Sequence, residues 1–169
     1  MRGRAIEFLL VQTRGGHWIF PKGNAEPGLT HAQAAALEAF EEAGVHGRME
    51  EASFARYVRR REEPGDSGAV DQTVKAYLCE VLWLDPPQEP DRRPTWFSAG
   101  KAKRRLRDDR ATHYAAELVR VIESAVARIH GAHPGTSTFV DSPQVDFLGK
   151  VQFIDRARAL TARRKNKSA

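Results

Sequence analysis

A helix with clear start and stop signals, set between strand-like segments, is the sequence feature that most constrains the fold of this chain. Thr30 and Gln33 have the spacing of a capping box, in which each side chain bonds the backbone of the other residue. Gly44 suits the position just past a helix end, where the backbone turns left-handed. The sequence therefore predicts a helix from residue 30 to about residue 43.

Strand-like segments precede and follow this helix. "AIEFLLVQT" and "HWIF" flank two glycines and predict a hairpin. "SFARYVRR", "DQTVKAYLCEVLWL" and "TWFS" predict three later strands, of which the second is long and could be bent. Residues 111–129 carry apolar side chains at steps of three and four, which is typical of a helix. This order of segments predicts an α+β domain with a mixed sheet between helices.

The domain is expected to occupy residues 1–130, followed by a C-terminal extension with a basic end at residues 131–169. Within the extension, "STFV" and "VQFI" are short strand-like pieces, and "VQFIDRARALTARRK" could instead form a basic helix. The strand-like pieces could fill an open sheet edge in the same chain or pair with a second subunit, which leaves a homodimer open.

Three glutamates crowd one end of the predicted helix. Glu38, Glu41 and Glu42 are neighbours at three- and four-residue spacing, and no lysine or arginine of the helix offsets them. The helix C-terminus carries negative partial charge as well, which adds to the repulsion. A divalent cation that prefers oxygen ligands, such as Mg²⁺ or Mn²⁺, would resolve the conflict. The alternative is an acidic, solvated helix edge.

The stretch from Gly23 to Val45 resembles the Nudix box, G-x5-E-x7-R-E-U-x-E-E-x-G-U, where U is bulky and apolar. The first glycine falls on Gly23, and the three glutamates, Gly44 and Val45 match in register. "PKG" before the box, "EEAGV" with Gly47 after it, and the later "WFS" are similar to diphosphoinositol polyphosphate and dinucleoside polyphosphate hydrolases of that family. The similarity covers roughly residues 8–122 and implies an α/β/α sandwich.

Two positions depart from the motif. Leu29 stands where the family has its first glutamate, and Leu37 stands where it has an arginine. An ion pair can be exchanged for an apolar pair at little cost when both partners change together. We therefore expect Leu29 and Leu37 to pack together and brace the loop against the helix. The alternative is a box that has lost its activity.

The resemblance implies a Mg²⁺-dependent hydrolase, with Mn²⁺ as the alternative ion. Its metal ligands would be Glu38, Glu41, Glu42 and the carbonyl of Gly23, which as a glycine can approach a metal closely. Glu41 and Glu38 are the candidates for the catalytic base. Which glutamate takes the proton is not decided by spacing.

Candidate phosphate-binding residues are basic and flank this motif: Lys22, Arg59, Arg61 and Lys75. Each also has a plain explanation, an exposed loop lysine or a charged strand edge that discourages aggregation. The formal net charge of +5 favours a highly phosphorylated small molecule as substrate.

The function expected from the sequence is hydrolysis of a phosphoanhydride bond in a polyphosphorylated small molecule. The alternatives are a Nudix-fold module that binds a nucleotide without cleaving it, and an RNA 5′-end pyrophosphohydrolase that uses the basic tail. No nucleic-acid-binding module is recognisable. No segment is apolar enough to span a membrane. The single cysteine, Cys79, excludes an internal disulfide, and a cytoplasmic location is expected.

Overall fold

The computed structural model of the protein describes residues 6–62, 69–131 and 139–140. Its elements follow in the order β1 (Glu7–Gln12), β2 (Trp18–Ile19), α1 (His31–Ala43), β3 (Val45–Glu50), β4 (Ala55–Glu62), β5 (Ala69–Ala76), β6 (Cys79–Leu84), the 3₁₀ helix η1 (Pro90–Arg92), β7 (Thr95–Ser98), α2 (Ala99–Arg107), α3 (Thr112–Gly131) and β8 (Phe139–Val140). The α+β fold expected from the sequence is confirmed.

Helix α1 begins and ends as the sequence predicts. Thr30 is its N-cap, and both hydrogen bonds of the capping box with Gln33 are present, at 3.1 and 2.9 Å. Gly44 closes the helix with φ 67°, and a Cβ there would collide with the carbonyl oxygen of Asp85. Glycine is therefore required at this position both for its backbone angle and for the close approach of the chain after β6.

The strands divide into three small sheets. β1 lies between β2 and β7, β3 lies between β6 and β8, and β4 and β5 form a two-stranded hairpin. Every strand pairing among the described residues is antiparallel, so the mixed sheet predicted from the sequence is not found there. Short connections account for the antiparallel pairing of β1 with β2 and of β4 with β5. The pairs β1–β7 and β3–β6 join strands far apart in the chain and are antiparallel too.

The prediction of one long strand for "DQTVKAYLCEVLWL" is wrong in that the segment forms two strands, β5 and β6. The chain breaks after Ala76, so that β5 pairs with β4 while β6 pairs with β3. Backbone bonds hold the break, from the amide of Phe54 to the carbonyl of Ala76 and from the amide of Glu50 to the carbonyl of Leu78. One apolar segment thereby serves two sheets.

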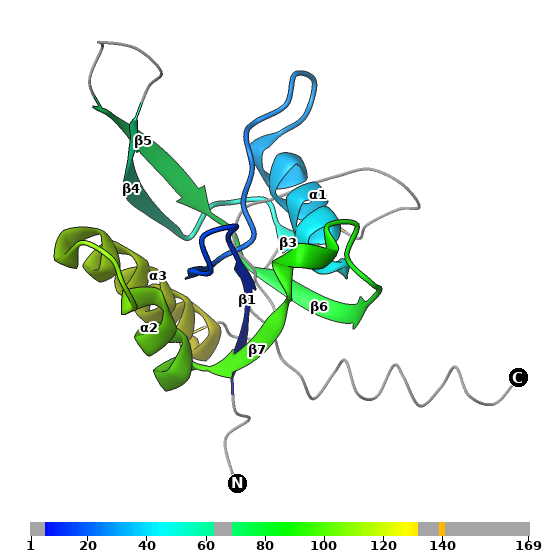
Figure 1. Ribbon diagram of the computed structural model, residues 1–169. Coiled ribbons are helices and arrows are strands. Elements are labelled where there is room, and N and C mark those ends of the chain that lie inside the picture. Colours follow the sequence, from blue (N-terminus) through cyan, green and yellow to red (C-terminus); the bar gives the residue numbers. More distant parts are fainter. Residues whose placement is uncertain (1–5, 63–68, 132–138, 141–169) are drawn as a thin grey trace, which may run out of the picture.

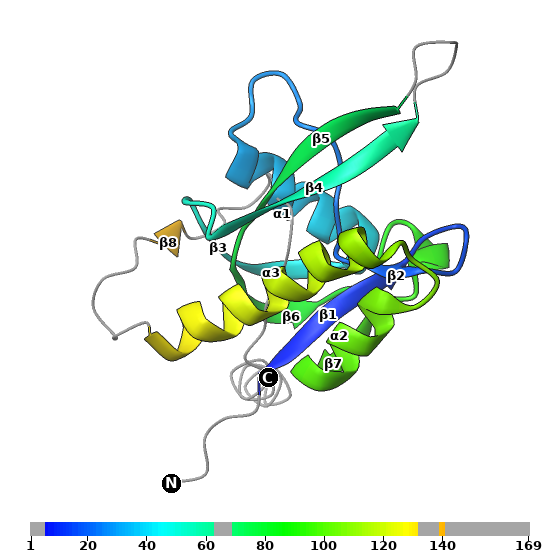
Figure 2. The ribbon, with the colours of Figure 1, turned by 90° about the vertical axis from the view of Figure 1, so that its left-hand side faces the viewer.

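Helices lie on both sides of the strands. In Figures 1 and 2, α2 and α3 run together along β1, and α1 lies on the other side, beside β3. The core joins Leu118 and Ile122 of α3 to Phe8 of β1 and Tyr57 of β4, and it continues to the alanine face of α1 at Ala39. Alanine is small enough for α1 to lie close to the strands, which places its glutamates at the surface of the core.

Little of the C-terminal extension is described. The segment Phe139–Val140 pairs with the backbone of β3, at Glu50 and Met49. The "STFV" piece therefore contributes a strand, although at the edge of β3 and not beside β1, whose two edges are taken by β2 and β7. The basic helix considered at the C-terminus lies outside the described residues. None of the helices in the described part of the chain is long and apolar enough to cross a membrane.

Candidate active site

Glu42 is the most deeply buried carboxylate of α1, with 1% of its surface exposed. The backbone N–H of Lys22 donates to its Oε2 at 2.9 Å, and the guanidinium of Arg92 lies 2.8 Å from its Oε1. Burial raises the pKa of Glu42 to about 7, while the Lys22 N–H and the Arg92 charge act in the opposite direction. Both oxygens of this carboxylate are thus held by defined partners.

Gly23 fits tightly against Glu38. A Cβ built on Gly23 would overlap the Glu38 carboxylate, so no larger residue fits there without displacing that group. Lys22 and Gly23 are adjacent, and together they contact two successive turns of α1. The loop that opens the sequence motif and the helix that ends it are therefore locked together through Glu42 and Glu38.

Glu41, unlike Glu42, is only partly buried. Burial raises its pKa, and the nearby negative charges of Glu26 and Glu89 raise it further. The N–H of Glu89 donates to the backbone carbonyl of Glu41 at 3.0 Å, which fastens the segment before η1 to the end of α1.

Arg92 is a residue that sequence reasoning missed. It lies in "DPPQEPDRRP", which predicts only a proline-rich connection, and yet it pairs with both Glu42 and Glu89. No local pattern marks it, because its partner Glu42 is fifty residues earlier in the chain. The only sequence signal was the negative charge of the glutamates, which no basic residue of the helix balances and which therefore requires a positive group from another segment.

The predicted phosphate-binding residues divide into two groups. Lys22 is half-buried beside the glutamates, where burial lowers the pKa of its ammonium, Glu42 opposes this shift, and Arg59 adds to it. Arg59 also donates to the side chain of Gln72 on the neighbouring strand, at 2.8 Å. The structure therefore brings Lys22 and Arg59 towards the glutamates.

Lys75 lies further along β5, where it lines a cavity beside the N-terminal half of α1. Arg61 belongs to β4, and its backbone pairs with Val70. The Arg61 side chain lies outside the described part of the structure, and its role in phosphate binding stays a prediction.

The donor set suits a hard divalent cation, because carboxylate oxygens are the ligands that Mg²⁺ and Mn²⁺ prefer. Within residues 6–62, 69–131 and 139–140, however, no group of three His, Cys, Asp or Glu side chains is gathered as a ready metal site. Glu42 instead has an arginine as its counter-charge. Ligation by all three glutamates therefore requires their side chains to move together from these positions.

The fold and the site together define a class of protein. Helices lie on both sides of the strands, and one helix carries the glutamates and is held to the Lys-Gly loop that precedes it. The chain belongs to the Nudix family, since residues 1–118 match the family model of the NUDIX domain. It is accordingly a hydrolase of phosphorus-containing acid anhydrides. In general terms it is a pyrophosphohydrolase of nucleoside diphosphate derivatives, and its substrate is a phosphorylated small molecule. Members of the family generally use Mg²⁺ or Mn²⁺.

Proposed function

We propose that the protein is a Mg²⁺-dependent pyrophosphohydrolase of a polyphosphorylated small molecule, and that it acts in the cytoplasm. The substrate is a dinucleoside polyphosphate, a diphosphoinositol polyphosphate or another nucleoside diphosphate derivative. The main support for the proposal is that the loop is held against the helix. The backbone N–H of Lys22 donates to Glu42, and Gly23 lies against Glu38. The positive net charge of the chain supports a polyanionic substrate.

Each glutamate has a part in this proposal. Glu38 and Glu42 bind the cation, and Glu41 is a third ligand or takes the proton of the attacking water; Glu38 is the other candidate for that base. A bound Mg²⁺ neutralises phosphate charge and lowers the pKa of a water molecule. The carbonyl of Gly23 is a further candidate ligand.

The basic residues near the glutamates are proposed to hold the phosphates. Lys22 and Arg59 are close enough to the glutamates to act on the phosphates next to the cleaved bond. Lys75 would act further from it, and Arg61 is the remaining candidate.

A hydrolysis screen tests this function. Dinucleoside polyphosphates, diphosphoinositol polyphosphates, nucleoside diphosphate sugars and nucleoside triphosphates are incubated with the protein and Mg²⁺, and products are identified by mass. Glu42→Gln and Glu41→Gln keep the shape of the side chain while removing its charge. Each should lower kcat/KM at least about 100-fold, because even the outer partners of metal ligands are worth 10- to 100-fold.

Glu123→Gln is the matched control, since Glu123 is an exposed residue of α3 that pairs with Lys103 outside this site. Its rate should equal that of the wild type. Phosphate release that survives both Glu41→Gln and Glu42→Gln would overturn the catalytic assignment. Tight nucleotide binding without any turnover would favour the binding module instead.

A further inference from the structure

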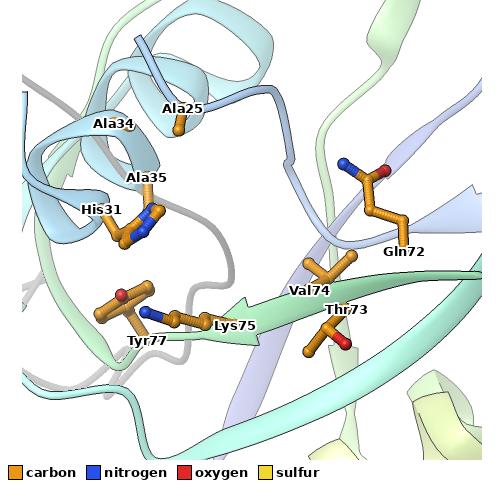
Figure 3. Close-up of a pocket in the computed structure, with 9 residues that line it drawn as sticks. All are labelled: Ala25, His31, Ala34, Ala35, Gln72, Thr73, Val74, Lys75 and Tyr77. Carbon is orange, nitrogen blue, oxygen red and sulfur yellow. The ribbon is translucent and has the colours of Figure 1, made fainter. Parts of the chain in front are cut away.

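A cavity opens between the first half of α1 and strand β5, next to the glutamate end of the same helix. Its volume is about 130 Å³. Ala34 and Ala35 form the helix side, and their small side chains leave the space open, as Figure 3 shows. The cavity is too small for a whole nucleotide but has room for a single phosphate group.

Polar side chains from three parts of the chain reach this cavity. Figure 3 shows His31 of α1 facing Tyr77, which follows β5, with the amine of Lys75 alongside the tyrosine ring. Gln72 lies further along the strand. An ammonium, an imidazole and a phenol are groups that can donate hydrogen bonds to phosphate oxygens.

Lys75, which lines the cavity, has a like charge directly opposite it on the neighbouring strand. Lys75 of β5 is the cross-strand partner of Arg56 on β4. Two positive charges in this position destabilise a strand pair. In the described part of the chain, neither residue forms an ion pair. Arg56 is also near enough to Tyr77 for its charge to act on the tyrosine hydroxyl. The arrangement is one that an anion would stabilise.

The cavity and the glutamates share one face of α1. His31, Ala35, Glu38 and Glu42 follow one another at steps of four, three and four residues, which places them in one line along the helix. At 1.5 Å per residue, the step from Ala35 to Glu38 is about 4.5 Å along the axis and the step to Glu42 about 10 Å. A molecule of moderate length can therefore reach both places at once.

Polar and positive groups also lie between the two places on the strand side. Gln72 lines the cavity and accepts a hydrogen bond from Arg59. The charge of Arg59 acts on Lys22, and the backbone of Lys22 donates to Glu42. Positive and donor groups thus follow the path from the glutamates to the cavity.

We propose that this cavity binds a phosphate group of the substrate other than those joined by the cleaved bond, through Lys75, His31 and Tyr77. Arg56, the cross-strand neighbour of Lys75, adds its positive charge. This inference rests on the proposed function and narrows it to substrates that carry a further phosphate beyond the cleaved pyrophosphate. Both a dinucleoside polyphosphate and a diphosphoinositol polyphosphate carry such a group. A nucleoside diphosphate sugar carries only the pyrophosphate and cannot use the cavity.

The test compares substrates with and without the additional phosphate. Lys75→Gln and Arg56→Gln are assayed on a dinucleoside polyphosphate, a diphosphoinositol polyphosphate and a nucleoside diphosphate sugar. The ratio of kcat/KM for the phosphate-rich substrate to that for the sugar derivative should fall about tenfold or more, through KM, since a charge-assisted hydrogen bond is lost. Whichever phosphate-rich substrate shows the fall is the one that reaches the cavity.

Lys101→Gln, at an exposed position of α2, removes the same charge elsewhere and should leave the ratio unchanged. An unchanged ratio in both Lys75→Gln and Arg56→Gln would overturn the inference while leaving the hydrolase assignment intact. Arg56 is exposed, so its variant should fold even if Lys75→Gln does not.

Binding of inorganic phosphate in the presence of EDTA provides a readout that needs no turnover. Calorimetry should show weaker binding to Lys75→Gln than to Lys101→Gln. Equal binding to these two variants would contradict the phosphate site, whether or not any substrate is hydrolysed. Complete absence of hydrolysis in the wild type, with phosphate binding lost in Lys75→Gln, would overturn the proposed function and retain the site.

Discussion

The guanidinium of Arg92 lies 2.8 Å from the buried carboxylate of Glu42, although the two residues are fifty positions apart in the chain. Glu42 belongs to the motif helix, and Arg92 belongs to η1 after a proline-rich connection. In the sequence motif that this chain resembles, an arginine stands where Leu37 is found. A positive charge therefore does reach the motif glutamates, but it arrives from outside the motif.

Removing this arginine should destabilise the metal-free protein. At about pH 8, above the raised pKa of Glu42, Arg92→Ala leaves the Glu42 charge buried without its partner, which costs about 3–5 kcal/mol for a fully buried pair. Because Arg92 is 23% exposed, we expect a smaller loss of about 2 kcal/mol in the free energy of unfolding. Urea unfolding in EDTA measures it. Arg104→Ala, at an exposed position of α2, is the control and should change stability by less than about 0.5 kcal/mol. If the two variants lose the same free energy of unfolding, the Arg92–Glu42 pair contributes nothing to stability.

The contact between Gly23 and Glu38 leads to a second prediction. In Gly23→Ala the new methyl group would overlap the Glu38 carboxylate, so the loop or the glutamate must move. We expect kcat to fall at least about tenfold, because small displacements of catalytic groups are costly, with about 1–3 kcal/mol of stability lost to overpacking.

Gly100→Ala is the matched control for this change. Gly100 lies in α2, and a Cβ there meets nothing within 4 Å. Since alanine favours a helix over glycine, this variant should be slightly more stable and have the wild-type rate. If Gly23→Ala keeps the wild-type rate, the position of Glu38 does not affect the reaction, and Glu38 is neither a metal ligand nor the base.

The raised pKa of Glu42 predicts a pH dependence of stability in the metal-free protein. Between its ordinary pKa of 4.5 and its folded value of about 7, the native state holds a proton that the unfolded state has lost. Stability from this group is therefore greatest below pH 4.5 and declines as the pH rises to 7, by an amount on the order of 3 kcal/mol.

Urea unfolding in EDTA at pH 5 and pH 7.5 measures this decline. Because other groups titrate too, the informative quantity is the difference between the wild type and Glu42→Gln. The glutamine cannot ionise, so its stability relative to the wild type should rise with pH. A constant difference across this range would mean that Glu42 is already ionised at pH 5.

Local signals fixed much of the fold. The capping box of Thr30 and Gln33 and the terminal Gly44 gave α1 its limits, since these are contacts between residues a few positions apart. "TWFS" coincides with β7. The apolar side chains at steps of three and four predicted both ends of α3 to within two residues. The break between β5 and β6 was missed because continuous apolar character does not show where a strand changes sheets.

The candidate site was predictable only in part. The motif predicted the glutamates and Gly23 as site residues. Spacing alone could not predict that Gly23 lies against Glu38, which the structure shows. Arg92 and the cavity at His31 went unpredicted, because both depend on contacts between distant segments. His31 in particular carries no sequence signal, and only the fold sets it opposite Lys75 and Tyr77.

Two leucines stand where the family motif has a glutamate and an arginine. Leu29 and Leu37 are both partly buried, and their mutual contact stays a prediction. If they brace the loop against α1, Leu29→Ala and Leu37→Ala should not be additive. The double-mutant cycle should give a coupling of about 0.5–1 kcal/mol in the free energy of unfolding.

Leu37→Ala combined with Ile129→Ala, at the far end of α3, is the control cycle and should be additive. A second test restores the charges of the family motif. Leu37→Arg alone places an uncompensated charge at a partly buried position, and adding Leu29→Glu should recover stability, because a complete ion pair can replace an apolar pair whereas half of one cannot. If the two leucines are uncoupled and the charge pair restores nothing, then Gly23 and Lys22 hold the loop against α1 without them.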